Sequence, residues 1–227
     1  MGMSKETLDK DIVVLLHGIG HTMWNMALME RRLRREGYKT LNLSYPSRKL
    51  HIEALSLWLG ERLELQGVWA QGKTVHFVTH SMGGLVTQHY LEANKSGIPQ
   101  GRLGRVVMLG PPNGGSEVAD FLHKMRLYKW VFGPAGQELT TGVRAGIRIT
   151  PWYELGVIAG TRSWMYPLAA VTMKKRANDG CVTVESTKID GMKEHITLPV
   201  LHGFMGWNRA AQRQTANFLK TGRFTHG

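Results

Sequence analysis

Apolar and polar positions follow one another in blocks along this 227-residue chain. Six short apolar runs carry few charges and contain β-branched residues, as do strands that are buried on both faces of a sheet. We therefore predict six strands, at Ile12–Leu16, Thr40–Leu43, Val75–Val78, Val106–Leu109, Leu155–Ala159 and Ile196–Leu201.

Segments with helical periodicity lie between several of these runs. The clearest one, Ile52–Leu65, places Leu55, Leu59 and Leu63 at a spacing of four residues. Alternation of strands and helices predicts an α/β fold, with a mostly parallel sheet and right-handed crossovers. No repeat or low-complexity linker interrupts the pattern, so we expect a single domain over residues 1–227. The other predicted helices are Met23–Glu36, Leu85–Ala93 and Asn208–Leu219.

The stretch from Pro111 to Thr150 breaks the alternation. It begins with a Pro-Pro pair, contains several glycines, and is long for a connection within one domain. An insertion of this length is often a lid or a binding loop, and a packed helical excursion is the alternative. Its apolar residues predict one amphipathic helical patch, made of Phe121, Leu122, Met125, Trp130 and Phe132.

The sequence "VTHSMGGLVTQ" places a serine, Ser81, between a predicted strand and a predicted helix. A turn this sharp brings strand and helix close together, so small residues are favoured two positions before and after the serine. Gly83 meets this requirement, whereas Thr79 is larger than such a turn favours. Ser81 is therefore a candidate nucleophile, and the alternative is a serine that only caps a helix.

Three further segments follow predicted strands in the same way. "LLHGIGHT" (Leu15–Thr22) ends the first strand, "NDGCVTVES" (Asn178–Ser186) contains an Asp-Gly pair, and "HITLPVLHGFMGWN" (His195–Asn208) spans the last strand. "LGPPNGGSEVA" (Leu109–Ala119) leads into the insertion. Together with the T-x-S-x-G segment, these stretches resemble the α/β-hydrolase superfamily, in particular its bacterial lipases and esterases. The resemblance covers about Ile12 to Leu219 and implies a minimal six-stranded α/β-hydrolase fold with a lid-like insertion at 111–150.

The resemblance also implies roles for individual residues. Ser81 corresponds to the nucleophile, Asp179 to the acid and His202 to the base of a catalytic triad. The backbone N–H groups of Ile19 and Met82 correspond to the oxyanion hole, and His17, Gly18 and Gly83 support the two loops. An ordinary Asp-Gly turn is the alternative for Asp179. His195 is a less favoured base, because it lies at the start of its strand.

Composition narrows the remaining possibilities. Cys181 is the only cysteine, which excludes a disulfide within the chain and a cysteine-rich zinc site. His17 and His21 have metal-like spacing but flank glycines rather than share a helix face, so we expect no metal and no cofactor. The polar amino terminus lacks the apolar core of a signal peptide, which predicts a cytoplasmic protein, or an exported one if a signal was removed.

The formal net charge of +12 suggests an anionic partner. No zinc-finger spacing or RNA-binding aromatic motif is present, so we do not expect nucleic acid. The clusters "RRLRR" (Arg31–Arg35) and "KKR" (Lys174–Arg176) are interpreted most simply as solvated faces. Basic and aromatic residues mix within the insertion, which suits peripheral contact with an anionic membrane; a solvated basic face is again the alternative.

These observations predict a serine hydrolase that acts on a small-molecule ester. A carboxylic ester with a short to medium acyl chain is the first choice, because a small chain has little material for a long pocket. The alternatives are a lipid-ester or amide hydrolase that acts at anionic membranes, and a non-catalytic binding protein with the same fold.

Overall fold

The structure of the protein, a computed structural model, describes residues 10–71, 73–147, 149–173 and 176–225. The polar segment 1–9 and both lysines of the "KKR" cluster, Lys174 and Lys175, lie outside the described residues, as does Arg148 of the insertion. Among the residues described, no helix combines the length and apolar composition that crossing a bilayer requires.

The described strands form one six-stranded sheet in the order β2-β1-β3-β4-β5-β6, and each neighbouring pair is parallel. This confirms the predicted α/β fold with six strands. The strands are β1 (Ile12–Leu16), β2 (Lys39–Leu43), β3 (Val75–His80), β4 (Leu103–Leu109), β5 (Leu155–Gly160) and β6 (Glu194–Leu198).

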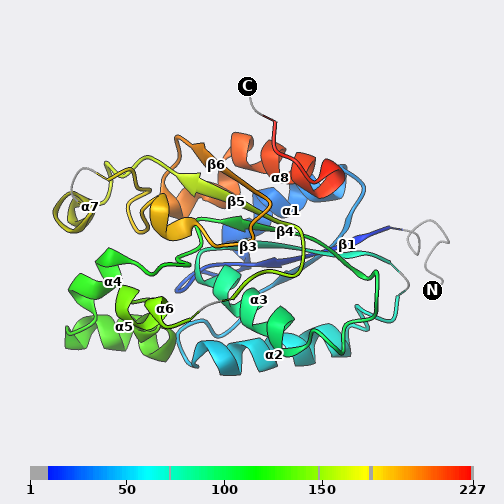
Figure 1. The fold of residues 1–227 in the computed structure, drawn as a ribbon, viewed down its shortest axis with the longest axis horizontal. Coiled ribbons are helices and arrows are strands. Elements are labelled where there is room, and N and C mark those ends of the chain that lie inside the picture. The colour runs from blue at the N-terminus through cyan, green and yellow to red at the C-terminus, as the bar shows by residue number, and fades with distance from the viewer. Residues whose placement is uncertain (1–9, 72, 148, 174–175, 226–227) are drawn as a thin grey trace.

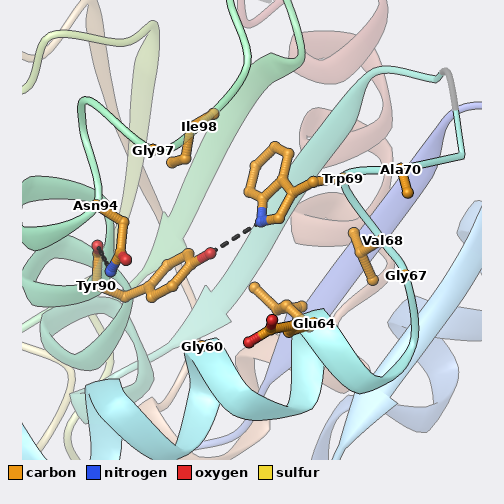
Figure 2. Close-up of a pocket in the computed structure, with 11 residues that line it drawn as sticks. Gly60, Glu64, Gly67, Val68, Trp69, Ala70, Tyr90, Asn94, Gly97 and Ile98 are labelled. Atoms are coloured by element: carbon orange, nitrogen blue, oxygen red, sulfur yellow. Dashed lines mark hydrogen bonds between the residues drawn. The ribbon is translucent and has the colours of Figure 1, made fainter.

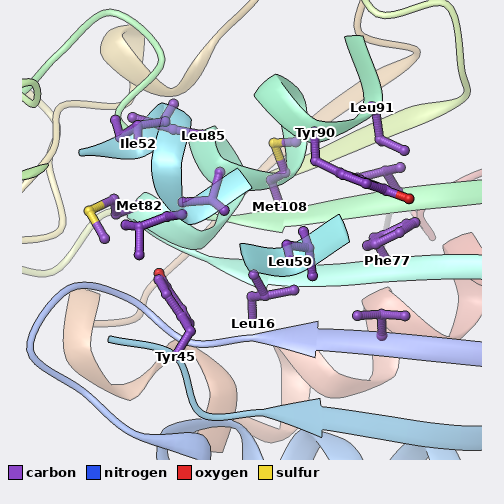
Figure 3. Packing of buried hydrophobic residues seen from close by; sticks show 14 of the residues in the cluster. Leu16, Tyr45, Ile52, Leu59, Phe77, Met82, Leu85, Tyr90, Leu91 and Met108 are labelled. Carbon is purple, nitrogen blue, oxygen red and sulfur yellow. The ribbon is translucent and has the colours of Figure 1, made fainter. Parts of the chain in front are cut away.

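Helices cover both faces of the sheet (Figure 1). One face carries α1 (Ala27–Arg35) and α8 (Arg209–Thr221), and the other carries α2 (Ile52–Leu65) and α3 (Met82–Ala93). Successive strand residues point to opposite faces, so each strand contributes to two cores. In β1, Val14 and Leu16 join the core under α2 and α3, whereas Val13 and Leu15 join the core under α1 and α8. Figure 3 shows the first of these cores, where Leu16 and Phe77 of the sheet meet Leu59 and Leu85 of the helices.

Most predicted elements differ from the structure by one to three residues at a boundary, and two of these differences are instructive. The last strand, expected at Ile196–Leu201, is β6 at Glu194–Leu198, because Pro199 has no N–H to donate to a sheet. The segment Met23–Glu36 begins as a 3-10 helix, η2 (Met23–Met26), before α1 starts. The predicted helix Ile52–Leu65 agrees with α2 at both ends.

The insertion contains three short helices, α4 (Glu117–Leu122), α5 (Arg126–Gln137) and α6 (Thr141–Ala145). They lie beyond the carboxyl ends of the strands, together with α7 (Pro167–Thr172) (Figure 1). The expectation of one amphipathic patch here was wrong. Leu122 and Phe132 pack against the core, whereas the side chains that point to solvent are Phe121, Met125 and Trp130.

A break inside α5 explains how the insertion turns back onto the domain. Gly133 has φ 61° and ψ −160°, and a side-chain carbon at this position would lie 1.7 Å from the carbonyl oxygen of Arg48. Only glycine permits both this backbone conformation and this approach. The insertion is thereby held against the segment that follows β2.

Candidate active site

Strands β1 and β3 are neighbours, but the chain leaves them in opposite directions, to β2 on one side and to β4 on the other. Open α/β sheets form a crevice at such a switch point, outside the carboxyl ends of the strands. The His-Gly segment follows β1 and Ser81 follows β3. The topology therefore brings these two sequence motifs to the same crevice.

Ser81 has a strained backbone. Its φ of 53° and ψ of −127° make it the only non-glycine residue with a positive φ in the described part of the chain. The Ser81 N–H donates to the carbonyl of Leu109 at 2.8 Å, which helps hold this conformation. A non-glycine residue persists in such a region only where its surroundings enforce it, and such residues cluster at functional sites.

The glycine two residues after Ser81 is required by a close approach. A side-chain carbon at Gly83 would lie 2.6 Å from the carbonyl oxygen of His17, at the end of β1. On the other side of the serine, Thr79 is fully buried, and its hydroxyl has no partner among the described residues. The sharp turn therefore forms despite the larger residue at this position.

Ser81, His202 and Asp179 form a chain of hydrogen bonds. His202 Nδ1 donates to Asp179 Oδ2 at 2.7 Å, which leaves Nε2 to accept from the Ser81 hydroxyl at 2.9 Å. His202 opens the 3-10 helix η4 (His202–Trp207), four residues after β6 ends. All three residues are buried, and Asp179 is fully inaccessible to solvent.

The Asp179 carboxylate is oriented by its own turn. Its Oδ1 accepts the N–H groups of Cys181 at 3.0 Å and Val182 at 2.8 Å, which leaves Oδ2 for His202. The ends of β4 and β5 enclose it, because side-chain carbons at Gly110 and Gly160 would come within 3.0 and 2.7 Å of Asp179. The acid thus has a fixed position next to the central strands.

The His17 ring lies away from Ser81 and fixes the loop after β1. Its Nδ1 donates to the Gly18 carbonyl at 2.7 Å, and its Nε2 accepts from the Tyr45 N–H at 3.2 Å. The Tyr45 hydroxyl donates to the His17 carbonyl at 2.8 Å. Burial lowers the pKa of His17 to about 4, so the ring is neutral at neutral pH.

The two predicted oxyanion donors lie beside the serine. A side-chain carbon at Gly18 would lie 3.0 Å from Ser81 Cβ, so the backbone leading to Ile19 passes directly over the serine. Met82 is the first residue of α3, where a backbone N–H has no acceptor within the helix. Its side chain is buried in the core (Figure 3).

Sequence reasoning missed the contribution of His80. This residue directly precedes Ser81 in the sequence. Its Nε2 donates to the carbonyl of His202 at 2.9 Å, and burial keeps its pKa well below the usual value. The ring centroids of His80 and His202 are 4.9 Å apart. No local signal predicts this contact, which spans 122 residues.

The other candidate histidines lie elsewhere or differ in role. His195 is the second residue of β6, and its Nε2 lies 2.9 Å from the Thr187 hydroxyl rather than near Ser81. His21 lies in the crevice, where burial and then the nearby His202 lower its pKa. Within the described residues, no three His, Cys, Asp or Glu side chains are grouped as a metal site requires.

A cavity of about 260 Å³ opens beside Ser81 and His202. Ile19 forms part of its wall, and Tyr166 and Cys181 line it as well. Burial raises the pKa of the Cys181 thiol, so this group stays protonated and is a poor nucleophile. Most of the remaining wall is apolar and comes from the insertion: Val118, Ala119, Leu122, Tyr128, Phe132 and Leu139.

Both the sequence and the fold of the chain resemble those of known proteins. The model of the alpha/beta hydrolase family matches residues 13–219. No curated protein matches the sequence. The mature form of a lipase from Bacillus licheniformis is 20% identical, with a TM-score of 0.70 over 86% of this chain and 85% of that one.

Two further solved structures resemble the chain. A metagenomic carboxyl esterase is 18% identical, with a TM-score of 0.67 over 89% of this chain and 66% of that one. A thioesterase of the prodiginine pathway of Streptomyces coelicolor is 14% identical, with a TM-score of 0.59 over 94% and 87%. Likeness at these identities shows a shared fold. Because the family model matches nearly the whole sequence, the chain belongs to the alpha/beta hydrolase family.

Proposed function

We propose that this protein is a serine hydrolase that cleaves short- to medium-chain carboxylic esters through an acyl-enzyme. The observation that carries the proposal is the hydrogen-bonded chain from Ser81 through His202 to Asp179, built on a strained serine at the switch point of the sheet. Two of the similar solved structures are named as a lipase and a carboxyl esterase.

In the proposed mechanism, the Ser81 oxygen attacks the ester carbonyl while His202 Nε2 takes the hydroxyl proton. Asp179 holds the tautomer with a proton on Nδ1 and stabilises the imidazolium that forms. The proton then passes to the departing alcohol, which leaves an acyl group on Ser81. Water attacks this acyl group with His202 as the base, and the carboxylic acid is released with a free serine.

The negative charge that develops on the carbonyl oxygen needs preorganised donors. We assign this role to the N–H groups of Ile19 and Met82, because one lies in the loop over Ser81 and the other at the start of α3. Loss of one such donor typically costs ~10²–10³ in kcat. The start of a helix adds a favourable partial positive charge.

Chain-length preference follows from the size and polarity of the cavity. Its volume of about 260 Å³ is just below the range of about 300–1,000 Å³ that is usual for small-molecule sites. Each methylene that the apolar wall buries contributes about 0.8 kcal/mol, and methylenes beyond the wall contribute little. The cavity therefore favours an acyl chain that fits within it.

A series of p-nitrophenyl esters from acetate to palmitate tests this proposal. We expect kcat/KM to rise, peak at a short or medium acyl chain and then fall. The Leu122→Phe variant, which narrows the cavity, should move the peak to shorter acyl chains. The control Val143→Phe alters a residue outside the cavity and should leave the peak where it is. Activity that still rises at palmitate, with emulsified triglyceride as the best substrate, would contradict the assigned substrate class.

A further inference from the structure

A second concave feature lies between α1 and α8, apart from the cavity beside Ser81. This groove has a volume of about 470 Å³, and the charged residues that line it are all arginines. No aspartate or glutamate is among its lining residues. The lining is made up of Leu28, Arg31, Arg32, Arg35, Trp207, Arg209, Gln212 and Arg213.

Most of these arginines lack a neutralising partner. Arg32 pairs with Glu36 at 2.6 Å, whereas Arg31, Arg35, Arg209 and Arg213 have no carboxylate partner within the described residues. Positively charged side chains that line one groove repel one another. An anion bound between them would offset this repulsion.

The direction of α8 strengthens the positive potential of the groove. Arg209 is the first residue of this helix, and no acidic residue occupies its first turn. A helix amino terminus carries a partial positive charge and disfavours a cation there. The helix α8 thus begins with an arrangement that costs stability in the free protein and suits an anionic ligand.

The margin of the groove is apolar and exposed. Trp24, Leu28 and Trp207 have 71%, 44% and 48% of their surface accessible to solvent. The Trp207 indole N–H donates to the Trp24 carbonyl at 3.1 Å, and the rings of Phe204 and Trp207 are 6.1 Å apart. Exposed apolar side chains that adjoin one another mark an interaction site more often than scattered ones do.

The same elements lead directly to the candidate active site. Phe204 and Trp207 belong to η4, whose first residue is His202. Trp24 and Asn25 belong to η2, and the Asn25 amide donates to the Gly203 carbonyl at 3.0 Å. The apolar margin of the groove therefore shares its elements with His202 and Gly203, which line the Ser81 cavity.

We propose that the groove and its apolar margin dock the protein on an anionic phospholipid bilayer. The arginines bind lipid phosphates, and Trp24, Leu28, Phe204 and Trp207 enter the headgroup layer. Arginine and aromatic residues in one surface suit a bilayer interface, where charge and apolar material lie within a few ångströms. A nucleic acid also offers phosphates, but it gives the exposed leucine no apolar counterpart. Docking does not depend on catalysis.

Vesicle co-sedimentation of the full chain tests the proposal. With phosphatidylserine vesicles at low salt, we expect strong binding that fades by roughly 0.5 M salt, where the Debye length is about 4 Å. Neutral phosphatidylcholine vesicles should bind much less. The triple variant Arg35→Gln, Arg209→Gln, Arg213→Gln should lower the partition coefficient on the order of 100-fold.

A matched control removes the same number of charges elsewhere. Lys10→Gln, Lys95→Gln and Arg223→Gln alter exposed residues close to the amino ends of the strands, and should change binding by less than about 5-fold at physiological salt. Ser81→Ala should bind vesicles as the parent does, so a failure of the proposed ester hydrolysis leaves this test intact. Circular dichroism confirms that each variant is folded.

Several results would overturn the proposal. One is the absence of binding to phosphatidylserine at low salt. Another is an equal loss in the control triple, which would mean that only net charge matters. A loss confined to Lys124→Gln, Arg126→Gln, Lys129→Gln would place docking on the insertion instead. Tighter binding of an RNA oligonucleotide than of vesicles, lost in the groove variant, would assign the groove to nucleic acid.

Discussion

Two cavities of similar size lie at opposite ends of the sheet. The one at the carboxyl ends, about 260 Å³, contains Ser81 and His202. The one near the amino ends, about 290 Å³, lies between the ends of α2 and α3 and is lined by Trp69 and Tyr90 (Figure 2). Volume does not distinguish them, so the difference in chemistry must come from the residues on their walls.

The polar groups of the cavity near the amino ends form hydrogen bonds with one another. The Trp69 indole N–H donates to the Tyr90 hydroxyl at 2.8 Å, and the Asn94 amide donates to the Tyr90 carbonyl at 2.9 Å (Figure 2). Burial raises the pKa of Tyr90, so its phenol remains neutral. At the carboxyl ends, by contrast, a strained serine is hydrogen-bonded to a histidine that is itself oriented by a buried carboxylate. Backbone geometry and hydrogen bonding, rather than cavity size, single out the carboxyl ends as the candidate active site.

Removing the proposed base, His202, should have the largest effect on catalysis. We expect His202→Ala to lower kcat for ester hydrolysis on the order of 10⁴–10⁶-fold, because His202 Nε2 is the group that accepts from the Ser81 hydroxyl among the described residues. The double variant with Ser81→Ala should lose little more, since the two residues act as a unit. His195→Ala serves as the control and should retain most of the activity. Activity in His202→Ala near that of the parent would invalidate the assignment.

Acid should lower the free energy of unfolding through buried histidines at both ends of the sheet. His17 at the carboxyl end and His76 at the amino end have pKa values that burial lowers from 6.5 to about 4. Between these values the unfolded chain binds protons that the native chain does not, so stability is full above about pH 6.5 and falls as the pH drops toward 4. A depression of this size corresponds to about 3 kcal/mol for each histidine.

Urea unfolding at pH 7 and at pH 4.5 measures this loss. His76→Asn keeps an acceptor for the Arg105 N–H, which now donates to His76 Nδ1 at 2.9 Å, and removes the titration at the amino end. This variant should show a smaller pH dependence than the parent, but not a flat profile, because the buried His17 and His80 keep their lowered pKa values. Stability that stays constant or increases on acidification would show that the two rings are not held neutral.

Strain at the carboxyl end should appear as a gain in stability when it is released. Ser81→Gly and Ser81→Ala both lose the hydroxyl, but only glycine adopts φ 53° without cost. We expect the glycine variant to have a free energy of unfolding about 1 kcal/mol higher than the alanine variant, in spite of glycine's larger entropy when unfolded. Equal stabilities in chemical denaturation would mean that the turn stores no strain.

The smallest effect is expected at the amino-end cavity. Tyr90→Phe removes the acceptor of the Trp69 N–H and should lower the free energy of unfolding by about 1 kcal/mol. Ester hydrolysis should be unaffected, because this cavity lies at the other end of the sheet from Ser81. A large loss of kcat in a stably folded Tyr90→Phe would show that the two ends are coupled.

The sequence predicted the strands and helices well, because each element depends on the spacing of apolar residues within its own segment. The strand Ile12–Leu16 and the helix Ile52–Leu65 were placed at their observed bounds, since a buried parallel strand and an amphipathic helix each carry their own periodicity. Errors arose where local features overrode the pattern. Pro199 ends β6 earlier than its apolar run suggests. In the insertion, α4 ends at Leu122 and α5 begins at Arg126, where one continuous patch was expected.

The candidate site likewise contains parts that local motifs predict and contacts that they do not. Ser81, Asp179 and His202 lie in motifs that can be recognised separately, and the structure brings all three together. The contacts of His80 with the His202 carbonyl and of Tyr45 with His17 join residues far apart in sequence and follow no motif. The arginine groove depends on α1 and α8 lying side by side, which the cluster Arg31–Arg35 alone does not indicate. The oxyanion donors Ile19 and Met82 stay predictions.

Covalent labelling tests the central claim most directly. A fluorophosphonate reacts with a serine only where a neighbouring base has activated its hydroxyl, and the modified residue is located by mass spectrometry of the digested protein. We predict a single adduct on Ser81, lost in Ser81→Ala and strongly slowed in His202→Ala, with the equally buried Ser47 unmodified. No adduct on Ser81 in the folded parent, or an adduct that forms as fast in His202→Ala, would contradict the account.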